Sequence, residues 1–334
     1  MWIQLEPGAD ASEVRAQLQA LGQWTTKLTG TDGTVGFQVA PHSQPIPKGR
    51  ILAIEGVTDV ASANSPHPLV DQQAKGQVVV SGRHFGGDRP ILMAGPCSVE
   101  SEAQIHQSAA MVAAAGASFL RGGAFKPRTS PYAYRGAGPE GLVWMRQAAD
   151  AHGLGVITEV MSERDVELVA RYADIMQIGS RNMQNYALLD AVGRAGMPVM
   201  LKRGMHGYVE EWLLAGEHLM HAGAKAVIFC ERGIRSFDNV ARNTLDLTAV
   251  ALLKHVHGQV VIADPSHAAG RVDLIPALSR AALAAGADGL ILEAHPNPAQ
   301  ARSDGPQSLV GHQLQSIARD MGLPPVHSEA HARL

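Results

Sequence analysis

From residue 91 onward, short apolar segments alternate with amphipathic segments, and this alternation constrains the fold more than any other feature of the sequence. The intervening segments have helical periodicity, and several end in glycine, as helices commonly do. Eight strands alternating with helices predict an α/β fold of the (βα)8 TIM-barrel type, although a doubly wound open sheet is the alternative. The predicted strands cover residues 91–94, 117–120, 155–160, 174–178, 198–201, 226–230, 260–263 and 289–292.

Residues 1–70 are predicted to form a small domain of their own. Strand-like segments at 2–5, 24–28, 34–39 and 57–61 are separated by helical patterns at 10–21 and around 51–54. The order strand-helix-strand-strand-helix-strand predicts a ferredoxin-like α+β domain, which is more often regulatory or structural than catalytic. Residues 65–76 have the composition of a linker, and residues 77–88 are expected to form a hairpin that opens a barrel domain over 77–323.

Polar residues follow every predicted barrel strand at the point where it ends. In a barrel the carboxyl ends of the strands meet at one face, where such enzymes build their active sites. A surface loop would explain any one of these residues, but it does not explain all eight strand ends together. The residues concerned include Cys97, Arg121, Glu159, Gln177, Arg181, Lys202, Arg232, Asp264, His267 and Glu293.

The segment Leu120–Ser130 concentrates positive charge directly after a predicted strand. It contains Arg121, Lys126 and Arg128 but no carboxylate. Because the formal net charge of the chain is −3, this positive charge is local and favours a small anionic ligand over nucleic acid or a membrane surface. Further cations are predicted at the same barrel face, so two or more phosphate or carboxylate groups are expected there. These cations are Arg181, Lys202 and Arg232.

Four residues that can bind metal follow the first, seventh and eighth predicted strands: Cys97, His267, Glu293 and Asp304. The first and eighth strands are neighbours in a closed barrel, so these side chains can converge. A thiolate, an imidazole and two carboxylates suit one divalent ion such as Mn²⁺, Fe²⁺, Co²⁺ or Zn²⁺ better than Mg²⁺ or Ca²⁺. A small buried cysteine and a structural histidine are the alternatives. The residues alone therefore indicate a metal-assisted reaction of phosphorylated small molecules.

Composition excludes several other classes of function. Aromatic residues make up only 4% of the chain, too few for a surface that stacks nucleic-acid bases. We expect no membrane span, because no apolar run is long enough to cross a bilayer. The start of the sequence lacks the features of a signal peptide, and two distant cysteines do not suggest a disulfide framework. A cytoplasmic location is expected.

The barrel motifs resemble those of the 3-deoxy-D-arabino-heptulosonate 7-phosphate (DAHP) synthases, type I beta subgroup. This resemblance implies condensation of phosphoenolpyruvate with D-erythrose 4-phosphate, the first step of the shikimate pathway toward chorismate and the aromatic amino acids. It extends from about residue 91 to residue 309. The motifs are Ala94-Gly-Pro-Cys-Ser98, Leu120–Ser130, Gln177-Ile-Gly-Ser-Arg-Asn182, Leu201-Lys-Arg203, Cys230-Glu-Arg-Gly-Ile-Arg235, Asp264-Pro-Ser-His267 and Ser303-Asp-Gly-Pro-Gln-Ser308.

The resemblance also implies roles for single residues. The four metal-capable residues named above match the family's ligands, and Cys97, His267 and Lys126 are the expected catalytic residues. Arg128 and Thr129 match the groups that receive erythrose 4-phosphate. The groups that hold phosphoenolpyruvate match Arg121, Lys126, Arg181, Lys202 and Arg232.

The main alternative is the sister activity, 3-deoxy-D-manno-octulosonate 8-phosphate (KDO8P) synthase, which uses arabinose 5-phosphate. Pro127 and Arg128 favour the four-carbon acceptor, because at this point the sequence of KDO8P synthases resembles Lys-Ala-Asn-Arg. A catalytically inactive barrel is a further alternative, but the complete set of ligands and cations argues against it. By resemblance, the first domain is expected to bind tyrosine or phenylalanine as an allosteric effector, and the chain to form a homodimer or homotetramer.

Overall fold

The structure, a computed structural model, describes residues 1–29, 33–61, 65–73, 76–126, 130, 132 and 134–323. The chain divides into two compact units, Met1–Pro66 and His67–Leu334. Each unit has its own hydrophobic core, and each is described by itself.

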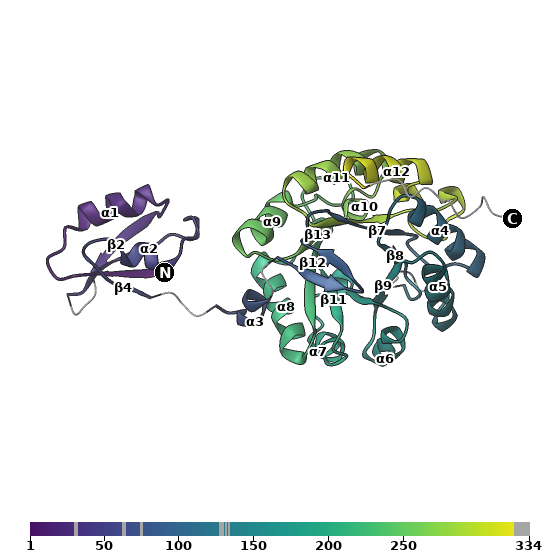
Figure 1. The fold of residues 1–334 in the computed structure, drawn as a ribbon, viewed down its shortest axis with the longest axis horizontal. Coiled ribbons are helices and arrows are strands. Elements are labelled where there is room, and N and C mark those ends of the chain that lie inside the picture. Colours follow the sequence, from purple (N-terminus) through teal and green to yellow (C-terminus); the bar gives the residue numbers. More distant parts are fainter. Residues whose placement is uncertain are drawn as a thin grey trace. The chain divides into compact units, whose positions relative to one another are not determined.

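The first unit is a four-stranded antiparallel sheet with two helices (Figure 1). Its strand order is β2-β3-β1-β4, which confirms the ferredoxin-like arrangement. The Asp10 carboxylate accepts from two backbone N–H groups of the first helical turn and so fixes the start of α1. Ile3, Phe37 and Ile51 are fully buried between the sheet and the helices. The elements are β1 Trp2–Leu5, α1 Ala11–Ala20, β2 Thr25–Thr29, β3 Val35–Val39, α2 Lys48–Leu52 and β4 Val57–Ala61.

In the second unit, strands β7 to β14 close into a parallel barrel, as the alternation predicted. Strand β14 pairs with β7, so the eighth predicted strand joins the first. The strands are β7 Ile91–Gly95, β8 Phe119–Arg121, β9 Gly155–Val160, β10 Ile175–Ile178, β11 Pro198–Lys202, β12 Ala226–Glu231, β13 Val261–Ala263 and β14 Gly289–Glu293.

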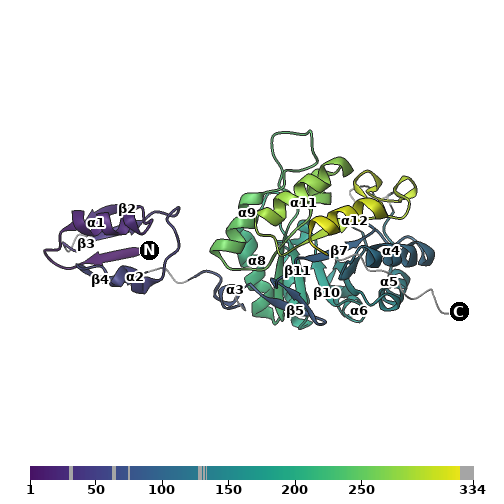
Figure 2. The ribbon, with the colours of Figure 1, turned by 45° about the horizontal axis from the view of Figure 1, so that its top comes forward.

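Helices surround the barrel on the outside (Figures 1 and 2). They are α4 Glu102–Ala114, α5 Pro139–Ala151, α6 Val166–Ala170, α7 Tyr186–Arg194, α8 Val209–Ala222, α9 Leu247–Ala251 with its continuation η3 Leu252–Val256, α10 Pro265–Ala269, α11 Ile275–Ala284 and α12 Gly311–Asp320. Short 3₁₀ turns are η1 Glu163–Asp165, η2 Ser180–Asn182, η4 Val272–Leu274, η5 Pro298–Gln300 and η6 Gly305–Gln307.

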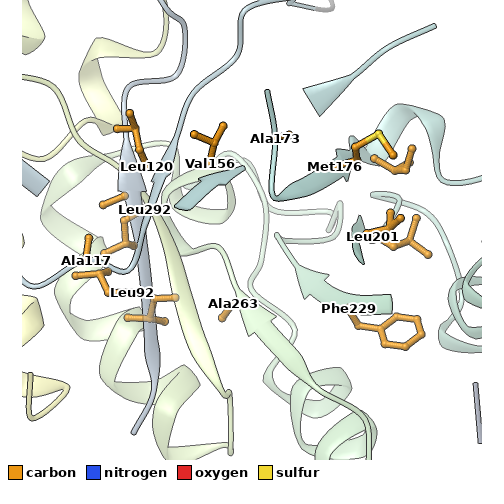
Figure 3. Packing of buried hydrophobic residues seen from close by; sticks show 14 of the residues in the cluster. Leu92, Ala117, Leu120, Val156, Ala173, Met176, Leu201, Phe229, Ala263 and Leu292 are labelled. Atoms are coloured by element: carbon orange, nitrogen blue, oxygen red, sulfur yellow. The ribbon is translucent and has the colours of Figure 1, made fainter. Parts of the chain in front are cut away.

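The barrel strands are buried on both faces, which explains their continuous apolar sequences. Leu92 packs outward against the helices together with Leu120, Phe229 and other residues of that layer (Figure 3). Its neighbour Met93 packs inside the barrel. Because successive residues of a strand point to opposite faces, one apolar run supplies both cores.

Strands β5 (Val78–Val80) and β6 (Arg83–Phe85) form the expected hairpin, whose Val78, Val80 and Phe85 pack with the inner barrel core.

The linker interpretation of residues 65–76 is wrong in part, since Pro68–Gln72 form a short helix, α3, beside α8 (Figure 1). The Glu217 carboxylate accepts from the N–H groups of Leu69 and Val70, and this long-range contact cannot be predicted from local composition. Among the described residues, no helix is long and apolar enough to cross a membrane.

Candidate active site

A polar pocket opens at the carboxyl ends of the barrel strands. Arg121 and Lys202 are the last residues of β8 and β11, Glu159 and Gln177 lie near the ends of β9 and β10, and Arg232 follows β12. Among the described residues, six cationic side chains and two carboxylates line this pocket. The lining residues are Arg121, Lys126, Glu159, Gln177, Gly179, Ser180, Arg181, Lys202, Met205, Arg232, Arg242, His267 and Asp304.

The predicted metal-binding residues come together at one side of this pocket. Donor atoms of Cys97, Glu293 and Asp304 all lie within 4.8 Å of one another. The Cys97 Sγ is 2.9 Å from Asp304 Oδ2, although the two residues are 207 positions apart in the sequence. His267 stands beside this triad, with its Nε2 3.2 Å from Glu293 Oε1.

The His267 ring is held from its other side. Its Nδ1 lies 2.7 Å from Asp264 Oδ2, while Asp264 Oδ1 accepts from the His267 backbone N–H at 3.0 Å. A carboxylate on one ring nitrogen is the usual support of a metal-binding histidine, because it directs the other nitrogen toward the ion. In this structure that other nitrogen faces Glu293.

Asp304 has an unusual backbone conformation. Its φ and ψ are 50° and 30°, in the left-handed region that few residues other than glycine adopt. Strain of this kind occurs at functional sites, where it aims a side chain. Arg242 and Gln307 brace the surroundings, since Arg242 Nη1 lies 3.4 Å from Asp304 Oδ1 and 3.1 Å from Gln307 Oε1. Gln307 in turn donates to Glu293 Oε2.

Three of the predicted substrate cations are fixed by hydrogen bonds. Arg121 Nη1 donates to the Pro96 carbonyl at 2.9 Å and to Glu293 Oε1 at 3.0 Å. Lys126 Nζ donates to the Cys97 carbonyl at 2.9 Å. Lys202 Nζ donates to Asp264 Oδ2, the same oxygen that contacts His267.

The remaining predicted cations differ in burial and in how far the structure describes them. Arg232 is buried and lines the pocket, and Arg181 lines it from an exposed position in η2. Arg128 and Thr129 lie outside the described residues.

Arg242, which no motif in the sequence indicated, lies in the long segment after β12 and reaches the pocket. A third arginine after Arg232 and Arg235 in this segment was the available signal. The sequence patterns also indicated no role for Asp264, which pairs with both Lys202 and His267.

A glycine at position 179 permits the close approach of Glu159, because a Cβ there would lie 1.9 Å from Glu159 Oε1.

The protonation states follow from burial and charge. Burial raises the pKa of the Cys97 thiol to about 12, and the Glu293 carboxylate adds to this effect. For Glu293 itself, burial opposes ionisation, but His267 and Arg121 outweigh it and lower the pKa. Burial lowers the pKa of His267, so the neutral imidazole predominates at neutral pH.

This donor set fits a divalent transition ion. It combines one sulfur, one imidazole nitrogen and two carboxylates, a mixture that suits borderline metals. The high pKa of Cys97 keeps the thiol protonated when no cation is near, and a bound cation would displace that proton. The imidazole already carries the carboxylate support that metal-binding histidines need.

Known proteins similar to this chain cover up to 96% of it. The sequence profile of the DAHP synthetase I family matches residues 69–322. The chain is 38% identical over 332 residues to phospho-2-dehydro-3-deoxyheptonate aldolase of Thermotoga maritima, with 96% of each sequence covered. It is 31% identical over 248 residues to 2-dehydro-3-deoxyphosphooctonate aldolase of Acidithiobacillus ferrooxidans, with 69% of this chain and 87% of that protein covered.

Solved structures agree with this relationship. A crystal structure of the Thermotoga maritima phospho-2-dehydro-3-deoxyheptonate aldolase (DAHP synthase) superimposes with a TM-score of 0.75 at 36% identity, covering 96% of both chains. A truncated form of 3-deoxy-D-arabino-heptulosonate 7-phosphate synthase from the same organism gives a TM-score of 0.69 at 41% identity. That match covers 74% of this chain and 90% of the truncated one.

Proposed function

The chain belongs to the DAHP synthetase I family, and from this premise we propose that it condenses phosphoenolpyruvate with D-erythrose 4-phosphate in a metal-dependent reaction. The products are 3-deoxy-D-arabino-heptulosonate 7-phosphate and inorganic phosphate. The observation that carries the proposal is the meeting of two sets of side chains. The metal-capable side chains of Cys97, Glu293 and Asp304, with His267 beside them, adjoin a pocket rich in arginine and lysine. Arg121 lines this pocket and also contacts Glu293.

The chemistry requires both sets. In the reaction, C3 of phosphoenolpyruvate forms a bond to the aldehyde carbon of erythrose 4-phosphate. Water adds at C2, and phosphate leaves with cleavage of the bond between C2 and oxygen. Three anionic groups must be held, namely one carboxylate and two phosphates, and bidentate arginines are suited to this task.

Different residues of the chain are assigned to binding each substrate and to positioning the binding groups. We assign the binding of phosphoenolpyruvate to Arg121, Lys126, Arg181, Lys202 and Arg232. Asp264 is a positioning residue, because it holds Lys202 and the His267 ring at once. Arg128 and Thr129 are assigned to erythrose 4-phosphate on their sequence motif alone.

A divalent cation bound by Cys97, His267, Glu293 and Asp304 would supply Lewis acidity toward the aldehyde oxygen. Lys126 is assigned a second role as proton donor. Its Nζ is held by the Cys97 carbonyl, so it stands beside the ligand set and lines the substrate pocket.

The assignment is tested by phosphate release from the two substrates. We expect release from phosphoenolpyruvate with erythrose 4-phosphate, loss of activity with EDTA, and recovery with Mn²⁺. Arabinose 5-phosphate is the control acceptor, because it would reveal KDO8P synthase activity. The related octonate aldolases cover about two thirds of this chain, whereas the heptonate aldolase also covers its first unit, which favours the four-carbon acceptor. Faster release with arabinose 5-phosphate would contradict the proposal.

The unit Met1–Pro66 is assigned a regulatory role, with tyrosine or phenylalanine as effector. This unit has its own core, and it contributes none of the described residues that line the pocket. A homodimer or homotetramer in the cytoplasm is the assembly and location that we propose with it.

A further inference from the structure

A second group of side chains that can bind metal lies on the outer side of the barrel, beside α8. Donor atoms of His67, Asp71 and His257 all lie within 4.8 Å of one another. Glu210, in the first turn of α8, adds a carboxylate oxygen 3.9 Å from His67 Nε2. These residues come from three separate segments: the start of α3, the end of η3 and the start of α8. None of them lines the polar pocket.

We propose that this His67 cluster, defined as His67, Asp71, His257 and Glu210, binds a divalent transition-metal ion distinct from the one proposed at the pocket. Two imidazoles with carboxylates are the donor set of Zn²⁺, Ni²⁺, Co²⁺ and Cu²⁺ sites, whereas Mg²⁺ and Ca²⁺ prefer oxygen alone. The inference goes beyond the proposed activity, because it concerns the anchoring of α3.

The donor atoms of His67, Asp71 and His257, all within 4.8 Å of one another, need to move closer together to complete a tetrahedral site. With metal–nitrogen distances near 2 Å, two donors of a tetrahedral ion stand about 3.4 Å apart. The two imidazole rings, 5.7 Å apart between centroids and edge to face, both adjoin the same carboxylate. The side chains of Asp71 and Glu210 are 38% and 57% exposed, so small rotations can bring their oxygens inward. The exposure also gives an ion access from solvent.

The backbone that carries these ligands is firmly braced. Gln259 Nε2 donates to the Val70 carbonyl at 2.9 Å and to the His257 carbonyl at 3.1 Å, so one side chain joins the two histidine-bearing segments. Gln73 donates to the Val227 carbonyl and accepts from the Val227 N–H, which fastens the end of α3 to β12. A site supported in this way loses little freedom when a ligand binds.

A simpler interpretation is that the cluster only stabilises a short helix. His67 Nδ1 lies 2.9 Å from Asp71 Oδ1, a hydrogen bond that would support α3 without any metal. That interpretation accounts for two of the four residues. It gives no reason for His257 and Glu210 to approach the same pair, and the experiment below separates the two interpretations.

The test measures bound Zn²⁺ in the full chain. Protein stripped of metal is dialysed against buffered Zn²⁺, and the metal per chain is determined by atomic emission. We expect His257→Gln to bind one equivalent less than the wild type, or to bind that equivalent at least tenfold more weakly. The control His221→Gln removes an exposed histidine of α8 that lies outside the cluster, and it should bind as the wild type does.

Because the readout is a difference between variants, it is independent of whether the pocket binds metal. Co²⁺ gives a second check. Of the two proposed sites, the one at the pocket contains a cysteine and the His67 cluster does not, so the thiolate-to-cobalt absorption should be unchanged in His257→Gln while total bound Co²⁺ falls. Equal Zn²⁺ binding by wild type and His257→Gln would overturn the proposal. If His257→Gln does not fold, the Zn²⁺ bound by Asp71→Asn is compared with that of the wild type, and equal binding overturns the proposal in the same way.

Discussion

Arg121 Nη1 lies 3.0 Å from Glu293 Oε1, and the two side chains are only 5% and 1% exposed. The guanidinium belongs to the cationic set of the pocket, and the carboxylate belongs to the proposed metal-binding set. This buried ion pair therefore fixes the two sets relative to each other, although its members are 172 positions apart in the sequence.

Removal of Arg121 is expected to destabilise the metal-free protein. Arg121→Ala leaves the buried Glu293 carboxylate without its guanidinium, and breaking a buried pair in this way costs about 3 kcal/mol of unfolding free energy. Urea unfolding at pH 7 measures the loss. Arg271→Ala, which breaks the exposed pair between Arg271 and Asp273, is the control and should leave the stability unchanged. Equal effects of the two substitutions would contradict the prediction.

The Cys97 thiol is expected to be unreactive in the folded, metal-free protein. Its pKa is raised by burial from the ordinary value of 9.0 to about 12, so its thiolate fraction at pH 8 falls about a thousandfold. Iodoacetamide should therefore alkylate native protein far more slowly than urea-unfolded protein. Cys97→Ser identifies the share of labelling that comes from Cys230. Comparable rates at Cys97 in both states would refute the predicted protonation.

Asp264 should contribute stability at neutral pH that disappears in acid. Burial would raise the pKa of this carboxyl, but His267 and Lys202 together hold it well below the ordinary 3.8. A lowered folded-state pKa stabilises the protein above pH 3.8, and this contribution is lost as the pH falls through the folded value. Asp264→Asn should thus cost about 3 kcal/mol at pH 7, and the difference from wild type should narrow below pH 3.8. Unfolding curves at several pH values measure the difference in unfolding free energy between wild type and Asp264→Asn. A difference that grows as the pH falls would contradict the prediction.

Lys126 should be required for turnover. Lys126→Ala removes the ammonium held by the Cys97 carbonyl and is expected to abolish phosphate release, while Lys126→Arg keeps the charge but displaces the donor. Lys225→Ala, at an exposed position outside the pocket, is the matched control and should retain activity. Near-normal turnover by either Lys126 variant would remove its assigned role as proton donor.

Deletion of the first unit should separate regulation from catalysis. A chain that starts at His67 keeps every described residue that lines the pocket, so phosphate release is expected to persist. Any inhibition of the full chain by tyrosine or phenylalanine should be lost. Titration of each amino acid against both chains measures this. Inhibition that survives the deletion would assign the effector site to the barrel.

Local sequence patterns were sufficient to predict the barrel and the rim that carries its polar residues. Apolar runs with intervening helical periodicity indicate which segments are buried. Closure of the parallel strands into a barrel then brings their carboxyl ends together. Cys97, Glu293 and Asp304 could be predicted to converge for that reason, since Cys97 follows β7, Glu293 ends β14 and Asp304 lies in the segment after β14. The short helix α3 gave no such signal, because the Glu217 carboxylate that supports it lies about 148 positions away.

The sequence by itself determined the class of fold, the order of the strands and the kinds of side chain at the barrel mouth. Only the tertiary structure decided which of these side chains pair. Asp264 holds both Lys202 and His267, and Arg242 reaches Asp304 across 62 positions. The physical reason is that periodicity encodes burial within one element, whereas a hydrogen bond between side chains depends on the relative placement of elements remote in sequence.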